Sequence, residues 1–394
     1  MKLRKFGLIL VLALLLGVLC VSALADDPVT ITVYNWGQYI SDGSDGCIDV
    51  IAAFEAETGI RVNYVTYDSN ETMYTKLKTG GESYDVIIPS DYMIARMINE
   101  DMLLPLNFDN IPNFEYIDES FRNMSYDPEN KYSVPYTWGT VGVIYNSKYV
   151  YPGDAGSWDL LWNPAYAGKI LMFDNPRDAF AISELTLGYS LNTEDESEMR
   201  AATMKLIDQK KLVQAYVMDQ VFDKMERAEA WIAPYYAGDY LLMVEENPDL
   251  EFFFPEEGFN LFVDACCIPK AAKNKEAAEL FINLLCRPDI CGENLEYLGY
   301  SVPVSQAKEY MDPELTSSSI AYPSEEILAK GESFSALSDT GNQLMNQLWL
   351  SVKTTDDVLG KYVIVTAVVI VLGIGTWLFL HVRRLRKKKR RGTY

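Results

Sequence analysis

Aromatic side chains recur along this 394-residue chain beside an acid or another polar group, close to the ends of predicted strands. The faces of aromatic rings attract ammonium groups by roughly 0.5 to 2 kcal/mol each. Carboxylates supply the charge-assisted hydrogen bonds that a buried ammonium needs. These residue types therefore predict a box for a flexible, apolar molecule that bears two or more amines. The candidate ligand-binding residues are Trp36, Tyr39, Ser90, Tyr92, Asp178, Tyr236, Asp239, Phe262, Asp264 and Tyr300.

A structural interpretation of the same residues competes with binding. Aromatic side chains also pack in cores, and acids also cap helices in solvent. For most of these residues taken singly, that interpretation is the stronger one. Binding gains support from the recurrence of the pattern and from the lack of a catalytic group.

Motifs for catalysis are weak in this sequence. It has neither a phosphate-binding GxxxxGK[ST] loop nor a glycine-rich nucleotide fingerprint. The only histidine is His381, which excludes an HExxH zinc site and gives metal binding little support. Ser305–Lys308 reads SxxK and Lys78–Gly80 reads KTG, but penicillin-recognising serine enzymes carry these motifs in the opposite order. We predict no enzyme and no cofactor.

The first third of the chain alternates strands and helices. A buried strand begins at Thr30 and ends at Asn35-Trp36-Gly37, where Trp36 and Tyr39 follow the β-branched run. The alternation predicts a parallel sheet with right-handed crossovers. Ser90 and Tyr92 then follow another strand and share a rim with Trp36, where ligands of open α/β sheets bind. Further predicted elements are a helix over 48–57, a strand over 61–65, a helix over 71–78 capped by Asn70, and a strand over 84–88.

The remainder of the exported chain predicts a second α/β lobe. A strand over 170–173 leads to the loop 174–178, and the apolar run 231–238 ends at Asp239. We place the crossings between lobes near residues 138, 263 and 318. The domains expected are lobe 1 at 26–138 with 264–318, and lobe 2 at 139–263 with 319–355.

The two ends of the chain predict export and anchoring. Residues 1–25 have the basic start, apolar run and small-residue cleavage site of a signal peptide. A lipoprotein signal at Cys20 is the less favoured alternative, because Leu19 is bulky. Residues 362–381 are apolar and long enough to cross a bilayer, and the basic tail 382–394 predicts a cytoplasmic C-terminus. The binding domain would then lie outside the cell membrane on a single-pass anchor.

The charge of the exported part is strongly negative. Eleven of the 34 basic residues lie in the signal peptide and tail, which hold no acid, so 23 basic and 56 acidic residues remain, a formal charge of −33. Such a charge argues against nucleic acid and steers cations inward. Among the cysteines, Cys266 and Cys267 read as core residues, and pairing of Cys286 with Cys291 stays open.

Several segments give the sequence a family resemblance. They are Tyr34–Tyr39, Tyr67–Lys78, Tyr84–Ser90, Tyr132–Gly139 and Leu298–Tyr300. With these, the exported region resembles the extracellular solute-binding proteins of spermidine/putrescine ABC transporters. The resemblance implies a two-lobed α/β fold of the type II periplasmic-binding-protein class, with a ligand cleft between the lobes. It also implies a polyamine ligand delivered to ABC permease subunits, with the aromatic residues boxing the ligand and Asp178, Asp239 and Asp264 holding its amines.

The chain also departs from that family at several positions. Asn175 stands where spermidine binders carry an acid, and Tyr236 and Phe262 stand where tryptophans are often found. A family glutamine falls on Phe334, whereas Asp239 resembles the putrescine-binding branch. The departures leave open whether putrescine or spermidine is preferred. The alternative ligand is another small cationic or polar solute; a membrane-anchored hydrolase or adhesin is the rival from another class.

Overall fold

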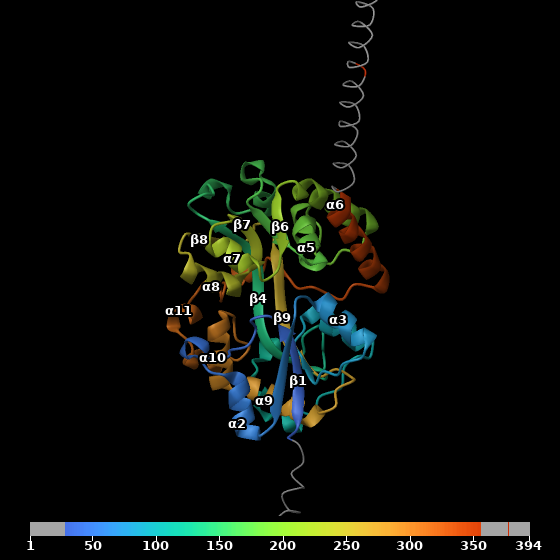
Figure 1. The fold of residues 1–394 in the computed structure, drawn as a ribbon, viewed down its shortest axis with the longest axis vertical. Helices are drawn as coiled ribbons and strands as arrows, with labels where there is room; N and C mark the ends of the chain where they lie inside the picture. The colour runs from blue at the N-terminus through green and yellow to red at the C-terminus, as the bar shows by residue number, and fades with distance from the viewer. Residues whose placement is uncertain (1–27, 356–376, 378–394) are drawn as a thin grey trace, which may run out of the picture. The chain divides into compact units, whose positions relative to one another are not determined.

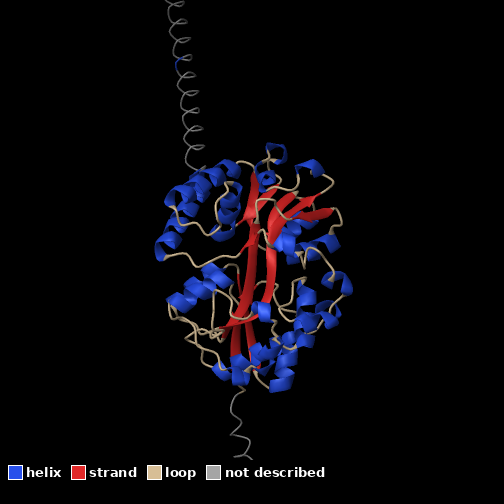
Figure 2. Ribbon diagram, turned by 180° about the vertical axis from the view of Figure 1, so that it is seen from behind, coloured by secondary structure: helices blue, strands red, loops and turns tan. Residues whose placement is uncertain are grey.

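The computed structural model describes residues 28–355 and Trp377. It contains two compact units: one comprises the chain up to Gly139 with Phe262–Tyr322, and the other comprises Thr140–Leu261 with the chain from Pro323. The chain therefore passes from one unit to the other at 139/140, 261/262 and 322/323. Each unit is an α/β assembly with its own sheet (Figures 1 and 2).

The first unit is built on three parallel strands, β1 (Thr30–Trp36), β2 (Arg61–Tyr67) and β3 (Val86–Ile87). β1 lies between the other two, so that Trp36 stands opposite Tyr67. The unit's share of β9 (Phe259–Cys267) runs antiparallel beside β3, and Ser90 forms an isolated bridge with Asp264. The carboxyl ends of the parallel strands therefore meet at the edge where Ser90 and Asp264 lie.

Helices flank this sheet, with α2 and α9 on one side of β1 and α3 on the other (Figure 1). The rings of Phe54 in α2 and Phe281 in α9 meet edge to face at 5.1 Å. The helical segments are α2 (Val50–Thr58), α3 (Asn70–Thr79), α4 (Asp91–Asn99), α9 (Lys275–Leu285), α10 (Pro288–Leu298), α11 (Pro313–Thr316) and the 3₁₀ turns Ser44–Gly46, Phe108–Asn110, Pro112–Tyr116, Glu119–Phe121 and Ser305–Tyr310.

Local signals explain most of these boundaries. α2 ends at Gly59, whose φ of 72° is the left-handed conformation that glycine adopts without strain. The predicted cap of α3 at Asn70 is wrong, because Ser69 is the N-cap and forms a capping box with Thr72. The strand predicted over 84–88 is confirmed only at its centre, as β3.

The second unit holds three parallel strands, β5 (Ile170–Phe173), β6 (Val213–Val217) and β7 (Ile232–Tyr236). The sheet order places β5 between β7 and β6. On the far side of β7, the second half of β4 (Ser133–Asn146) runs antiparallel and pairs in turn with β8 (Leu250–Phe253). The carboxyl ends of the three parallel strands again meet at one edge.

Helices also flank the second sheet, α5 and α6 on one side and α7 and α8 on the other (Figure 1). The elements are α5 (Pro176–Thr186), α6 (Glu196–Lys210), α7 (Val221–Glu226), α8 (Ala237–Glu246), α12 (Glu325–Leu328), β10 (Gly331–Glu332), the 3₁₀ turns Pro152–Asp154, Trp158–Trp162 and Pro164–Tyr166, and a final helix over 339–355. The final helix buries Met345, Leu348 and Val352, whose spacing lies on one helical face.

In the part of the chain that is described, no helix is long and apolar enough to cross a membrane. The predicted signal peptide 1–25, the predicted span 362–381 (apart from Trp377) and the tail 382–394 lie outside the described residues. In the described part of the chain, Cys266, Cys267, Cys286 and Cys291 are buried free thiols, so Cys286 and Cys291 are not joined.

Candidate ligand-binding site

At the centre of the first unit's candidate residues, Tyr39 contacts Asp264. The Tyr39 hydroxyl donates a hydrogen bond of 2.7 Å to Asp264 Oδ2, and both residues are buried. Burial, and next the Asp264 charge, raise the pKa of Tyr39 well above its ordinary value, so the phenol stays protonated. The pair is thus a carboxylate held by a neutral donor, a group that suits an incoming ammonium.

Aromatic rings surround this pair. Tyr300 meets Tyr39 edge to face at 5.4 Å, and Phe262 lies 6.4 Å from Tyr300. Gly139 permits the Phe262 position, because a Cβ at residue 139 would stand 2.7 Å from Phe262 Cζ. Tyr300 is placed by the end of α10, where Gly299 takes a φ of 70° and Tyr300 N bonds Leu295 O.

Trp36 lies at the carboxyl end of β1 and is half-buried. Its indole Nε1 donates a hydrogen bond of 2.9 Å to the carbonyl oxygen of Ile88, just beyond β3. Its ring is 4.8 Å from that of Tyr67 and 6.5 Å from that of Tyr39. The indole is therefore fixed at the sheet edge, with a partly exposed face.

A polar row continues from Ser90 to Tyr92 through Asn70. The Asn70 amide donates to Ser90 Oγ at 3.0 Å and to the Tyr92 hydroxyl at 3.2 Å. The Tyr92 hydroxyl donates in turn to Glu71 Oε1 at 2.9 Å. Asn70 and Glu71 escaped the sequence interpretation, because residues at a helix start read as capping groups.

Asp178 is the centre of the second unit's candidate residues. It lies in the first turn of α5, where its N–H donates to the N-cap side chain Asn175 at 2.8 Å. Asp178 Oδ2 accepts hydrogen bonds from Asn175 Nδ2 at 2.6 Å and from the Tyr236 hydroxyl at 3.0 Å. As in the first unit, a buried carboxylate is held by a phenol at the carboxyl end of a strand.

Asp239 lies in the first turn of α8, just after Tyr236, and is half-buried. The pKa of the neighbouring Tyr235 is raised well above its ordinary value by burial and then by the charges of Asp239, Asp219 and Asp178. These three acids follow β7, β6 and β5 respectively, so they gather at one edge of the sheet. Asp219 was missed by the sequence analysis, although it follows a strand just as the others do.

The structure thus joins the predicted residues within each unit. Contacts connect Trp36, Tyr39, Ser90, Tyr92, Phe262, Asp264 and Tyr300 in the first unit. In the second unit Tyr236 contacts Asp178, and Asp239 stands at the same edge. Phe334 lies under the guanidinium of Arg177, the residue before Asp178, at 4.4 Å. The binding role of these residues stays a prediction.

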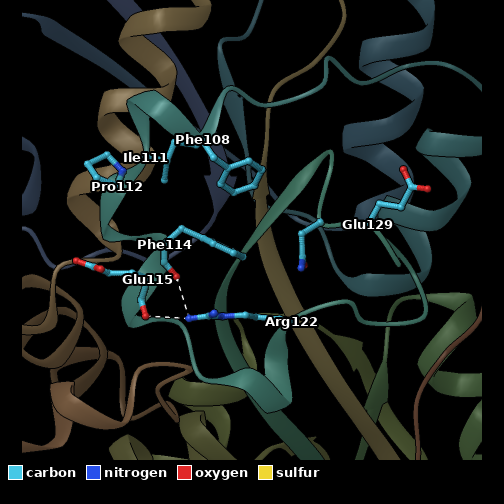
Figure 3. A pocket seen from close by; sticks show the side chains of 8 residues that line it. Phe108, Ile111, Pro112, Phe114, Glu115, Arg122 and Glu129 are labelled. Carbon is cyan, nitrogen blue, oxygen red and sulfur yellow. Dashed lines mark hydrogen bonds between the residues drawn. The ribbon is translucent and has the colours of Figure 1, made fainter.

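A separate hollow of about 460 Å³ lies in the first unit, away from the candidate residues (Figure 3). Phe108, Ile111 and Phe114 form its apolar wall. The guanidinium of Arg122 is already engaged there, donating to the carbonyl oxygens of Ile117 and Glu115 at 2.8 Å. The hollow contains none of the aromatic–acid pairs that define the candidate site.

Residues 81–331 match the bacterial extracellular solute-binding protein family. The chain belongs to this family. It is 35% identical over 312 residues to the spermidine/putrescine-binding periplasmic protein of Escherichia coli K12, covering 79% of this chain and 88% of that protein. It is also 27% identical over 353 residues to the putrescine-binding periplasmic protein PotF of the same organism, covering 85% and 94%.

A solved structure agrees with this assignment. A putative spermidine/putrescine ABC transporter protein from Listeria monocytogenes superposes with a TM-score of 0.78 at 38% identity, covering 83% of this chain and 99% of the other. The two-lobed α/β fold implied by the resemblance is thereby confirmed. Family membership also makes this solute-binding protein a binding component and not an enzyme.

Proposed function

We propose that this solute-binding protein captures putrescine or spermidine outside the membrane and delivers it to the permease of an ABC importer. The main support is that each unit holds a buried carboxylate that accepts a hydrogen bond from a tyrosine hydroxyl. The pairs are Asp264 with Tyr39 and Asp178 with Tyr236. Each such group suits an ammonium of a polyamine, and the rings around it suit the apolar chain. The names of the relatives supply the same ligand class.

The aromatic rings and the carboxylates would contact different parts of the ligand. Trp36, Tyr92, Tyr236, Phe262 and Tyr300 would contact the methylene chain and the ammonium faces. Asp178, Asp239 and Asp264 would hold the charges, and Ser90 would add a polar contact. In the second unit, the charges of Asp239, Asp219 and Asp178 all raise the pKa of Tyr235, so three carboxylates lie near one another. This group of carboxylates suits the more highly charged end of the ligand.

Membrane attachment is a second part of this proposal. The apolar run 362–381 and the basic residues after it support a C-terminal anchor that keeps the binding units beside the permease. Such tethering raises the effective concentration of receptor at the transporter. Extraction of cell membranes with alkaline carbonate tests it: an anchored chain stays in the pellet, and release into the supernatant overturns the anchor.

Calorimetry of the full-length chain tests the ligand class. Putrescine, cadaverine and spermidine are titrated in parallel with maltose and ferric citrate. Binding of polyamines alone supports the proposal, because the candidate residues offer carboxylates and aromatic rings to ammonium groups. Binding of maltose or ferric citrate without a polyamine would overturn it.

A further inference from the structure

The final helix over 339–355 approaches the candidate ligand-binding edge of the second unit. The ammonium of Lys353 donates to Asp174 Oδ1 at 2.5 Å. Asp174 directly precedes Asn175, the residue that caps α5 and holds Asp178. One lysine near the end of the described chain therefore contacts the loop that carries a candidate ligand carboxylate.

The same ammonium contacts a second strand end. It lies 4.3 Å from the ring centre of Tyr216 in β6 and 5.4 Å from that of Trp349 in its own helix. Tyr216 and Trp349 meet edge to face at 5.6 Å. Tyr216 pairs with Met172 of β5, two residues before Asp174. Lys353 thus joins the carboxyl ends of two adjacent parallel strands.

Other contacts hold the helix in this register. Lys210, the last residue of α6, donates to the carbonyl oxygens of Val352 at 3.0 Å and Lys353 at 2.6 Å. These two hydrogen bonds tie the end of α6 to the turn of the final helix that carries Lys353. Val352 is fully buried, so packing of this side chain also fixes the helical turn that carries Lys353.

We propose that Lys353 is a positioning residue for polyamine binding. By clamping Asp174 and Tyr216, it holds the β5–α5 loop so that Asn175 and Tyr236 present Asp178 to a ligand ammonium. Two further facts support this. Asp174 is close to half exposed, so its side chain needs a partner to be fixed. Asn175 also approaches Met218 Sδ, at 3.9 Å, so the loop contacts the chain just beyond β6 as well. This inference rests on the proposed function and adds the final helix to the binding apparatus.

A test must separate the effect of Lys353 on the net charge near the site from its effect on the position of the β5–α5 loop. Removing Lys353 alone leaves an extra negative charge near the site, which would attract a polyamine and mask the loss of the clamp. The double variant Lys353→Met with Asp174→Asn removes a cation and an anion together, so the net charge is unchanged. Lys353→Arg keeps the cation and the contact.

A matched control exists in the same unit. Lys148 pairs with Asp249 at 2.6 Å, and the exposure of Asp249 is close to that of Asp174, while Lys148 is more exposed than Lys353. This pair lies by Asn146 and Leu250, beside the amino end of β7 and at the opposite end from Tyr236. Lys148→Met with Asp249→Asn therefore deletes a surface ion pair without touching the β5–α5 loop.

Calorimetry with putrescine and spermidine on the full-length chain is the first test. We expect the Lys353/Asp174 double variant to bind three- to tenfold more weakly, and the control and Lys353→Arg to bind within twofold of the parent. Equal affinity of the Lys353/Asp174 double variant and the parent would overturn the proposal.

Hydrogen exchange in the ligand-free chain is the second test and needs no ligand. Peptides that cover 172–182 and 214–219 should exchange faster in the Lys353/Asp174 variant and not in the control. Unchanged exchange there contradicts the clamp even if the parent binds no polyamine. A parent that binds no polyamine, with faster exchange in the variant, refutes the proposed function and leaves the clamp standing.

Discussion

Tyr39 and Asp264 are 225 residues apart in the sequence and share a hydrogen bond of 2.7 Å. The phenol donates, because burial and the charge of Asp264 hold the pKa of Tyr39 well above its ordinary value. Asp264 is almost fully buried, so its carboxylate has given up most of its hydration. A group of this kind gains from an approaching ammonium.

Asp264→Asn should weaken polyamine binding at least tenfold, which corresponds to about 1.4 kcal/mol. The amide keeps the shape of the side chain but removes the charge that attracts the ligand. Calorimetry with putrescine and spermidine measures the loss. Unchanged affinity would mean that Asp264 is a structural carboxylate.

Tyr39→Phe should weaken binding about three- to tenfold, because the ring remains and only the donor to Asp264 is lost. A hydrogen bond to a charged group contributes roughly 1.5 to 3 kcal/mol, part of which the incoming ammonium replaces. Tyr240→Phe is the control, since its hydroxyl donates a long hydrogen bond, at 3.4 Å, to the carbonyl oxygen of Leu250. Equal losses in both variants would show a general effect on folding.

Trp36→Ala should weaken the binding of putrescine and spermidine about tenfold, as measured by calorimetry. The reason is the partly exposed indole face, held at the sheet edge by Ile88. Trp36→Phe, which keeps a ring, should lose less. If Trp36→Ala binds putrescine and spermidine as the parent does, Trp36 belongs to the core.

Asn175→Asp should change the choice between polyamines. The amide now donates to Asp178 at 2.6 Å, whereas an aspartate would place a second carboxylate there. Two adjacent carboxylates favour a ligand with more ammonium groups, so the affinity ratio of spermidine to putrescine should rise at least threefold. Competition titrations measure the ratio; an unchanged or lower ratio would contradict this role of Asn175.

Glu184 should make the stability of the second unit depend on pH. Its side chain is buried, its oxygens have no hydrogen-bond partner among the described residues, and its pKa is raised to about 8. Burial is the main cause; the charges of Glu198 and Glu332 add to it, and Arg177 opposes it. The carboxyl is therefore protonated in the folded chain at pH values where the unfolded chain has released the proton.

The sign of this dependence follows from proton linkage. Between about pH 4.5 and 8 the folded state binds more protons, so the free energy of unfolding falls as pH rises, by at most about 1.4 kcal/mol per pH unit. Denaturant titrations at pH 5.5 and 7.5 should show the loss in the parent and a smaller one in Glu184→Gln. If the free energy of unfolding changed equally with pH in the two proteins, a group other than Glu184 would cause the dependence.

Many residues of the candidate site can be predicted from the sequence because they lie at or just after the ends of strands. Trp36 ends a strand, and Ser90, Asp178 and Asp239 lie in the short segments that follow strands; parallel strands bring their carboxyl ends together. Asp219 follows the same rule but was missed, because β6, the strand that precedes it, was not predicted from the sequence.

Other features depend on long-range packing that local patterns do not carry. Lys353 and Asp174 are 179 residues apart, and neither lies in a recognisable motif. β4 passes from one unit to the other without interruption over Ser133–Asn146, so no change of composition marks the crossing. Asn70 was taken for a cap because Ser69, beside it, is an equally good capping residue.

Gly139 gives the ring of Phe262 its place, and this bears on how ligand preference diverges among related receptors. A methyl group at residue 139 would press on the tip of the ring and leave the backbone untouched. One mutation could then reshape the binding surface while every ligand-contacting residue kept its identity. Comparing the contact residues of two receptors would miss such a change, because the altered position would act through Phe262 and not through the ligand.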